Sequence, residues 1–202
     1  ISGLGADHRM FQNISVPGYR LIPVAWLPVA DSDDMATYAM KLAGSIAVPD
    51  PVILGLSLGG MLATEIAKQL PAATAIIVSS AKCREELGFT SPFLKWLDNW
   101  GVVPDFMFNR TFAVQFYVLG AETNADKALM KQIISDSDPV FVRRAIHMIL
   151  NWDGKGFPPN VVHIHGTSDR LIRSENVKPD YWVEGGSHIM ILNRANEISE
   201  IV

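Results

Sequence analysis

The sequence predicts an α/β protein with a doubly wound, mostly parallel sheet, in which helices cover both faces. Two observations carry this prediction. Short apolar segments alternate along the chain with longer segments whose apolar residues recur every three or four positions, as strands and helices alternate in α/β folds. In addition, residues 52–70 read directly as a short buried strand followed by a helix. One long segment, residues 82–157, interrupts the alternation.

The composition is that of one folded domain. Its 202 residues are 49% hydrophobic and 19% charged, with a formal net charge of −4, which excludes the disordered class. Lysine and arginine form no basic stripe, so we expect no nucleic-acid partner. No apolar run reaches the ~18 residues of a membrane span, and no secretory signal is visible. We therefore expect a cytoplasmic protein without a membrane span.

The first half of the chain predicts two strands and two helices. Residues 19–26 form a short β-type run, although Pro23 within it argues against a regular central strand. Acidic residues then precede apolar positions at helical spacing over residues 35–46. Residues 52–56 predict a buried strand. The four-residue spacing of leucine and isoleucine after it predicts a helix that ends at Pro71.

Three further strands and a closing helix are predicted in the second half. The strand candidates are residues 75–80, 161–165 and 181–184, which are short apolar runs bounded by turn residues. The tail, residues 189–202, has the spacing of an amphipathic helix. Because strands and helices continue to alternate here, both halves of the chain belong to the same sheet.

The long insertion predicts a helical cap. Residues 82–157 are far too long for an ordinary loop, and their later part, residues 124–152, has helical character. The α/β core would then comprise residues 1–81 and 158–202. Large apolar side chains in the insertion favour an apolar binding cavity. They are Phe89, Phe93, Trp96, Trp100, Phe106, Phe108, Phe112, Phe116 and Tyr117.

Ser57 lies in a G-x-S-x-G motif between the predicted strand and helix. A strand that reverses into a helix within one residue forces the serine into a strained conformation, and glycine is needed on both sides, here Gly55 and Gly59. The hydroxyl then projects above the carboxyl edge of the sheet, near the helix N-terminus. A plain tight turn also fits this pattern, so the motif alone does not identify a nucleophile.

Two later residues, together with Ser57, complete the set of three residue types that a serine nucleophile needs. Asp169 follows the strand candidate at 161–165, and His188 follows the one at 181–184. In a parallel sheet both emerge at the same carboxyl edge as Ser57. A serine hydroxyl becomes nucleophilic when an imidazole takes its proton, and a carboxylate orients that imidazole. The alternative, a turn-forming aspartate and a loop histidine, does not account for all three positions together.

An acyl-transfer site also needs donors for the oxyanion of its intermediate. The backbone N–H of Leu58, at the start of the helix after Ser57, is one candidate. The second is the backbone N–H of Leu4, in the glycine-containing stretch SGLGAD at residues 2–7. These two N–H groups are our predicted oxyanion hole.

With these motifs in order, the sequence resembles the α/β-hydrolase superfamily, of the compact kind with a helical cap. ISGLGADHRMF is similar to the family's oxyanion loop, LGLSLGGMLA to its nucleophile elbow, HGTSDRLI to its acid turn and GGSHIMI to its histidine loop. The resemblance covers nearly the whole chain outside the cap. It implies an eight-stranded, mostly parallel sheet, no cofactor, and a substrate pocket between sheet and cap.

The sequence departs from the family pattern in three places. It begins at about the family's third strand. We therefore expect further residues upstream, and the family's N-terminal strands are not part of this stretch. Ser2 and Gly3 stand where many members have His-Gly, which keeps the backbone donor and loses the imidazole. Asp169 and His188 are 188 − 169 = 19 positions apart, which leaves room for a clipped turn around residues 174–177 and not for a crossover helix.

Other reactive side chains are assigned no catalytic role. Cys83 is the single cysteine, so there is no internal disulfide, and neither the histidines nor the cysteine have metal-ligand spacing. The histidines at 163 and 165 alternate with apolar residues and are expected in the core. Asp153 and Glu184 are the alternative acids should Asp169 be misplaced. His8 follows the oxyanion loop and is expected to have no catalytic role, with substrate contact as the alternative. His147 is expected to pack or to lie at the surface.

The sequence therefore predicts a serine hydrolase that cleaves a carboxylic ester, or a related small apolar carbonyl compound, through an acyl-enzyme. Two alternatives stay open at this stage. The same triad supports a lyase or a C–C bond hydrolase, since fold and triad do not separate these reactions. The short distance in sequence between Asp169 and His188 favours a third reading, a non-catalytic protein that binds a small apolar ligand.

Overall fold

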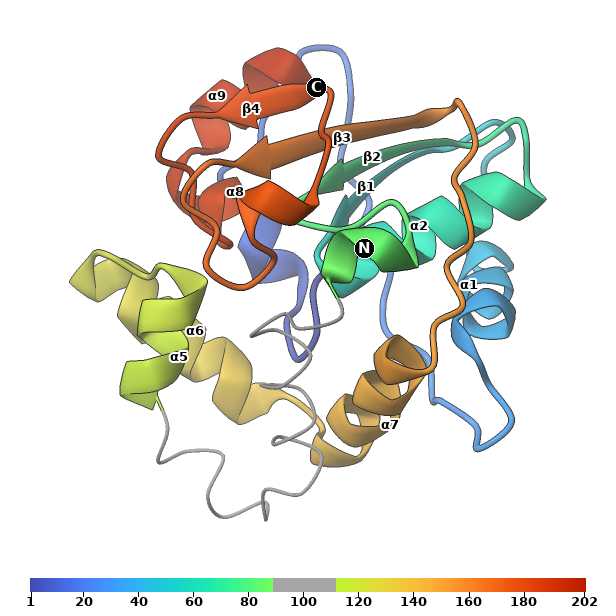
Figure 1. The fold of residues 1–202 in the computed structure, drawn as a ribbon, viewed down its shortest axis with the longest axis horizontal. Helices are drawn as coiled ribbons and strands as arrows, with labels where there is room; N and C mark the ends of the chain where they lie inside the picture. Colours follow the sequence, from blue (N-terminus) through green and yellow to red (C-terminus); the bar gives the residue numbers. More distant parts are fainter. Residues whose placement is uncertain (89–111) are drawn as a thin grey trace.

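The computed structural model describes residues 1–88 and 112–202. Within these residues, four parallel strands form one sheet in the order β1–β2–β3–β4 (Figure 1). All three neighbouring pairs are parallel, which confirms the predicted sheet. The resemblance implied eight strands, and the described residues supply four. The strands are β1 (Val52–Leu56), β2 (Thr74–Val78), β3 (Val161–Gly166) and β4 (Tyr181–Val183).

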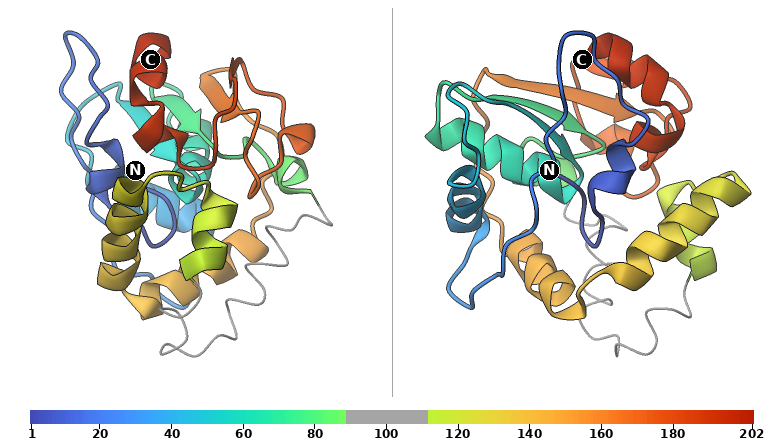
Figure 2. Two further views of the ribbon diagram at one scale, coloured as in Figure 1. Left: turned by 90° about the vertical axis from the view of Figure 1, so that its left-hand side faces the viewer. Right: turned by 180° about the vertical axis from the view of Figure 1, so that it is seen from behind.

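Helices cover both faces of this sheet, as Figures 1 and 2 show. Alternate residues of a strand point to opposite faces, so Ile53 and Ile77 pack in one apolar cluster with α1 and α2. Leu54 and Ile76 pack in the other, with α8 and α9. The sheet is therefore doubly wound, as predicted. The covering helices are α1 (Met35–Ala43), α2 (Leu58–Gln69), α8 (Met190–Asn193) and α9 (Ala195–Ile201).

The helix α1 begins where the acidic stretch predicted it. Asp34 accepts a hydrogen bond from the Thr37 N–H at 2.7 Å, and the Thr37 hydroxyl accepts one from the Asp34 N–H at 2.8 Å. This reciprocal capping box satisfies two backbone donors that have no partner within the helix. One face of α1 is buried against α2, and its Tyr38 hydroxyl donates to the Leu27 carbonyl at 2.8 Å.

Among the described residues between β2 and β3, the α-helices are α5 (Phe112–Leu119), α6 (Asn124–Asp136) and α7 (Pro139–Leu150). Figure 1 shows them together below the sheet. Buried residues of α7 join the cluster of α1 and α2, and Met130 and Ile133 of α6 join the cluster of α8 and α9. The predicted aromatic positions from 89 to 108 lie outside the described residues, and the assignment of residues 82–157 as a cap stays a prediction.

Two segments differ from the sequence prediction, and a third agrees with it. Residues 19–30 form no regular element, so the strand predicted at 19–26 is wrong: Pro23 removes a donor, and Tyr19 and Ile22 are exposed. The predicted closing helix is divided in two between Asn193 and Ala195. Between β3 and β4 the chain forms only a short 3₁₀ helix, η3 (Ser174–Asn176), as the spacing indicated.

The backbone of Ile1 continues the ladder of the sheet beyond β1. Its nitrogen donates to the Leu54 carbonyl at 2.7 Å, and its carbonyl accepts from the Leu56 N–H at 3.0 Å. This pattern is that of a parallel pair. The ladder fixes residues 2–7 beside the carboxyl end of β1.

In the part of the chain that the structure describes, no helix combines the length and apolar character that crossing a bilayer requires.

Candidate active site

Ser57 occupies the sharp turn between β1 and α2. Its φ of 52° and ψ of −118° lie outside the regions that ordinary residues adopt, a strain that persists only where surrounding structure enforces it. The flanking glycines are required for space. A Cβ on Gly55 would lie 2.4 Å from the Gly59 carbonyl oxygen, and one on Gly59 would lie 2.2 Å from the Ile1 carbonyl oxygen. The turn therefore combines a strained serine with two glycines for which a larger residue has no space.

The neighbouring strand holds the turn in place. The Ser57 N–H donates to the Val78 carbonyl at 3.0 Å, and the Ser80 hydroxyl donates to the Ser57 carbonyl at 2.7 Å. Both partners lie at or just beyond the end of β2. The strained backbone is therefore fixed by hydrogen bonds on both sides of the serine.

Asp169 lies in the turn after β3, with its side chain fully buried. One carboxylate oxygen, Oδ1, accepts the backbone N–H groups of Leu171 at 2.8 Å and Ile172 at 3.0 Å. Burial by itself would raise the pKa of this carboxyl, but the charge and hydrogen bond of His188 outweigh burial, so the pKa is lowered. Asp169 is thus held ionised and in one orientation.

The loop that carries His188 is packed against that turn. A Cβ on Gly166 would lie 2.1 Å from the Gly186 carbonyl oxygen, so the two backbones touch where only glycine fits. The Ser168 N–H donates to the same Gly186 carbonyl at 3.0 Å. On the other side, the Ile189 N–H donates to the Leu119 carbonyl at 3.2 Å, which joins the loop to the end of α5.

The three predicted residues meet at the carboxyl edge of the sheet. His188 Nδ1 lies 2.8 Å from Asp169 Oδ2, and His188 Nε2 lies 3.0 Å from Ser57 Oγ. Both distances are within hydrogen-bonding range. Asp169 and His188 reach each other although the connection between β3 and β4 contains no α-helix. Chemically, this arrangement can take a proton from a serine hydroxyl and stabilise the imidazolium that results.

The two backbone groups predicted to hold an oxyanion flank this constellation. Leu58 is the first residue of α2 and follows Ser57 directly, so its N–H lies at the positive end of the helix dipole. Leu4 lines the same cavity as Ser57 and His188. A Cβ on Gly3 would lie 3.4 Å from the Ser57 Cβ, so this loop passes beside the serine.

The cavity over Ser57 is small and mostly apolar. Its volume is about 70 Å³, below the ~300–1,000 Å³ typical of pockets for drug-sized ligands. Its far wall comes from α5, α6 and α7. The wall residues that the sequence did not single out are Gln115, Leu119, Met130, Ile134, Val142 and Ile149. Only their place in the wall of the cavity over Ser57 identifies them, because their sequence pattern is that of packing residues.

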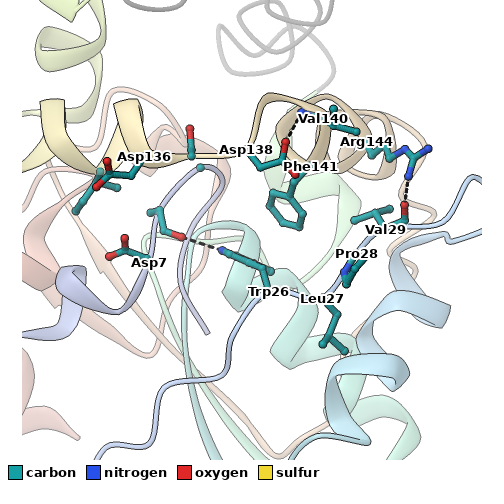
Figure 3. A pocket seen from close by; sticks show the side chains of 14 residues that line it. Asp7, Trp26, Leu27, Pro28, Val29, Asp136, Asp138, Val140, Phe141 and Arg144 are labelled. Carbon is teal, nitrogen blue, oxygen red and sulfur yellow. Dashed lines mark hydrogen bonds between the residues drawn. The ribbon is translucent and has the colours of Figure 1, made fainter.

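A larger pocket, of about 370 Å³, lies on the other side of the loop at residues 5–7. Trp26 and Phe141 form its floor, with ring centroids 4.7 Å apart, and the Trp26 indole donates to the Ala6 carbonyl at 2.8 Å (Figure 3). Asp7 and Asp136 lie at one end in Figure 3 and Arg144 at the other. Both pockets include Gly5, Ala6 and Ser137 in their walls, so they adjoin.

The remaining candidates lie away from Ser57. Asp153 is exposed and pairs with Lys155 at 3.1 Å, and Glu184 is exposed, so neither alternative acid reaches His188. His8 and His147 are exposed as well. Among the described residues, no group of three histidine, cysteine, aspartate or glutamate side chains is arranged to hold a metal ion.

Similarity to proteins of known structure is extensive in fold and low in sequence. An esterase from Exiguobacterium antarcticum superposes with a TM-score of 0.78 at 15% identity, over 98% of this chain and 87% of its own. A hydrolase from Oleispira antarctica gives 0.71 at 11% identity, over 99% and 86%. The N-acyl homoserine lactonase AidH, complexed with N-butanoyl homoserine, gives 0.67 at 15% identity, over 99% and 84%.

The sequence itself matches no protein-family model and no curated protein. The structural neighbours include esterases, a lactonase, a hydrolase and a bromoperoxidase, all of which have the α/β-hydrolase fold. With its parallel sheet, its helices on both faces and these superpositions, the chain has the α/β-hydrolase fold.

Proposed function

We propose that this protein is a serine hydrolase that cleaves small carboxylic esters or related apolar carbonyl compounds through an acyl-enzyme. The observation that carries the proposal is the hydrogen-bonded chain from Ser57 through His188 to Asp169, with distances of 3.0 and 2.8 Å. Fold neighbours described as esterases and a lactonase support ester-type substrates.

The reaction follows from the roles these groups can take. His188 Nε2 removes the proton from Ser57 Oγ as that oxygen bonds to the substrate carbonyl carbon. The tetrahedral intermediate collapses, the alcohol leaves with the proton from His188, and the acyl group stays on Ser57. Water then attacks the acyl carbon while His188 Nε2 takes a proton from it. The second intermediate releases the acid, and Ser57 Oγ takes the proton back from His188. Asp169 orients His188 throughout.

The oxyanion of each intermediate is assigned to the backbone N–H groups of Leu4 and Leu58. Such preorganised donors stabilise charge that develops only in the transition state. Because they belong to the backbone, side-chain substitution does not remove them, and the assignment is tested by the geometry of a bound transition-state analogue.

The two adjoining pockets suggest where the acyl part and the alcohol part of an ester substrate bind. The cavity of about 70 Å³ over Ser57 suits a short acyl group. The pocket of about 370 Å³, with Trp26 and Phe141 on its floor, has room for a larger, apolar alcohol part. We therefore expect acetate and propionate esters of bulky alcohols to be cleaved faster than octanoate esters of small ones.

The alternatives lack an observation of their own. Fold and triad do not distinguish a lyase or a C–C bond hydrolase, and product analysis on ester and diketone substrates separates them. The binding-protein reading relied on the short sequence distance between Asp169 and His188. Since these side chains lie 2.8 Å apart, that support is gone.

The first test is reaction with a fluorophosphonate probe followed by intact-mass measurement. An activated Ser57 gives one adduct per chain, and Ser57→Ala gives none. For ester turnover, we expect Ser57→Ala and His188→Ala each to lower kcat by about 10⁴–10⁶-fold, and the double variant to lose no more than either alone. Unlabelled, correctly folded protein, or near-normal turnover by Ser57→Ala, would rule the proposal out.

A further inference from the structure

Two buried histidines lie directly behind Asp169. His163 and His165 are two positions apart on β3, so their side chains share one face of the sheet, and neither exposes any surface. His163 Nε2 lies 3.2 Å from His165 Nδ1. His165 Nε2 lies 2.9 Å from the Ile172 carbonyl oxygen and 3.6 Å from Asp169 Oδ2. The pair therefore extends the chain of polar groups that begins at Ser57.

The partners of these rings determine where their protons are. The Ile172 carbonyl can only accept, so His165 Nε2 carries the hydrogen. Burial lowers the pKa of His165, although Asp169 opposes this, and burial lowers the pKa of His163 well below its usual range. Both rings are thus neutral. With its hydrogen on Nε2, His165 offers a lone pair at Nδ1, which accepts from His163 Nε2–H.

Both imidazole dipoles consequently point their N–H ends toward Asp169. Ile172 links the two systems, since its N–H donates to Asp169 Oδ1 at 3.0 Å while its carbonyl accepts from His165. A neutral donor in this place stabilises the buried carboxylate without introducing a charge that would compete with His188 for it.

We propose that His165, supported by His163, is a positioning residue that holds the Asp169 carboxylate ionised and oriented toward His188. This inference rests on the proposed function, because it assigns a task within the same reaction. His165 does not touch the substrate cavity, so its effect is on turnover and not on substrate binding.

Further polar groups lie at the His163 end of the pair, opposite Asp169. Glu86 Oε2 lies 3.8 Å from His163 Nδ1 and accepts the Lys82 N–H at 2.7 Å. Asp180 binds the backbone N–H of His163 at 2.8 Å. The Trp182 ring meets His165 edge-on with centroids 6.1 Å apart. The charge of the Lys82 side chain also acts on His163 and helps to lower its pKa. Together with Asp169 and His188, these are the titratable or aromatic groups that face the two rings in the described structure.

Kinetics of two variants test the proposal. His165→Leu removes the N–H that holds the Ile172 carbonyl and should lower kcat by about three- to tenfold, as expected for a lost neutral hydrogen bond, with KM changed less than about twofold. His165→Gln can place an amide N–H where Nε2–H was and should recover most of kcat. Thr64→Val is the matched control, since Thr64 is an equally buried polar residue of α2 that bonds the Gly60 carbonyl.

Proton positions in the wild-type protein provide a test that needs no turnover. Nitrogen-15 spectra of histidine-labelled protein, with His165 assigned from the His165→Gln variant, should show both rings as neutral Nε2–H tautomers at about pH 7 to 8. An Nδ1–H tautomer or a cationic ring at His165 would overturn the inference. So would a folded His165→Leu protein with wild-type kcat, or an equal loss of kcat in Leu and Gln variants of equal stability.

The two proposals can fail separately. A wild-type protein that neither labels at Ser57 nor hydrolyses esters refutes the proposed function, and the tautomer spectra still decide the arrangement behind Asp169. A protein that labels and turns over normally while His165→Leu is unaffected refutes the positioning role alone. If His165→Leu does not fold, the comparison of wild type with His165→Gln and the spectra decide.

Discussion

At the scale of single residues, the site depends on a few positions where the available space determines which residue fits. Ser57 keeps a strained backbone because hydrogen bonds with Val78 and Ser80, at the end of β2, hold it on both sides. The sequence identified the serine, aspartate and histidine that meet here, because glycine spacing and strand ends are local signals. It could not identify the contact between Gly166 and Gly186, since approach of two distant backbones leaves no local pattern.

Substituting the second glycine of the elbow should destabilise the whole protein. In Gly59→Ala the new methyl group would lie 2.2 Å from the Ile1 carbonyl oxygen, and backbone cannot move aside cheaply. We expect a loss of about 1–3 kcal/mol in the free energy of unfolding, the range for overpacking, measured by urea denaturation. Gly44→Ala is the control, because its Cβ would meet its nearest atom at 3.4 Å. Equal stability of the two variants would contradict this reading of the elbow.

At the scale of elements, strands and helices with strong periodicity were predictable and irregular segments were not. β1 and α2 begin and end within a residue of their predicted bounds. Residues 19–26 show the opposite case. They have the composition of a strand but pair with no strand in the described structure, and Pro23 has no N–H to donate to such a pairing. The link between β3 and β4 was read correctly as too short for a helix, and geometry alone shows that such a link still brings Asp169 to His188.

The capping box of α1 gives a stability prediction whose size depends on pH. Asp34→Ala should cost about 0.5–2 kcal/mol at neutral pH. Hydrogen bonds from Thr37 lower the pKa of Asp34 below its ordinary value of 3.8. A group with a lowered folded pKa stabilises the protein above its unfolded pKa, and that contribution is lost as the pH falls through the folded value. The stability difference between wild type and variant should therefore shrink below pH 3.8.

Urea unfolding followed by circular dichroism at neutral and acidic pH measures this difference. Asp153→Ala is a suitable control, because Asp153 is exposed and outside any helix cap. We expect it to change stability by less than about 0.5 kcal/mol. A stability difference for Asp34→Ala that stays constant down to strongly acidic pH would show that the carboxylate is not what caps the helix.

At the scale of the whole molecule, Cys83 provides an internal measure of folding. Burial, followed by a hydrogen bond to Glu85, raises the pKa of its thiol to about 11, and the thiolate is the reactive form. The native protein should react slowly with a disulfide reagent at pH 8, and one equivalent per chain should react rapidly in urea, where the thiol pKa returns to about 8.5. Absorbance of the released thiol measures both rates. Fast stoichiometric reaction without urea would contradict the buried environment.

The insertion between β2 and β3 has a consequence for the order of events during folding. Ser57 and His188 are 131 positions apart in the chain, and the pairing of β2 with β3 must bridge the insertion before they meet. Contacts between such distant residues form slowly, because the intervening chain must lose entropy first. The elbow at β1 and α2 is local and can form early, whereas its histidine arrives only with the second half of the sheet. A partly folded chain therefore holds Ser57 without His188 beside it, so the proposed reaction requires the complete sheet.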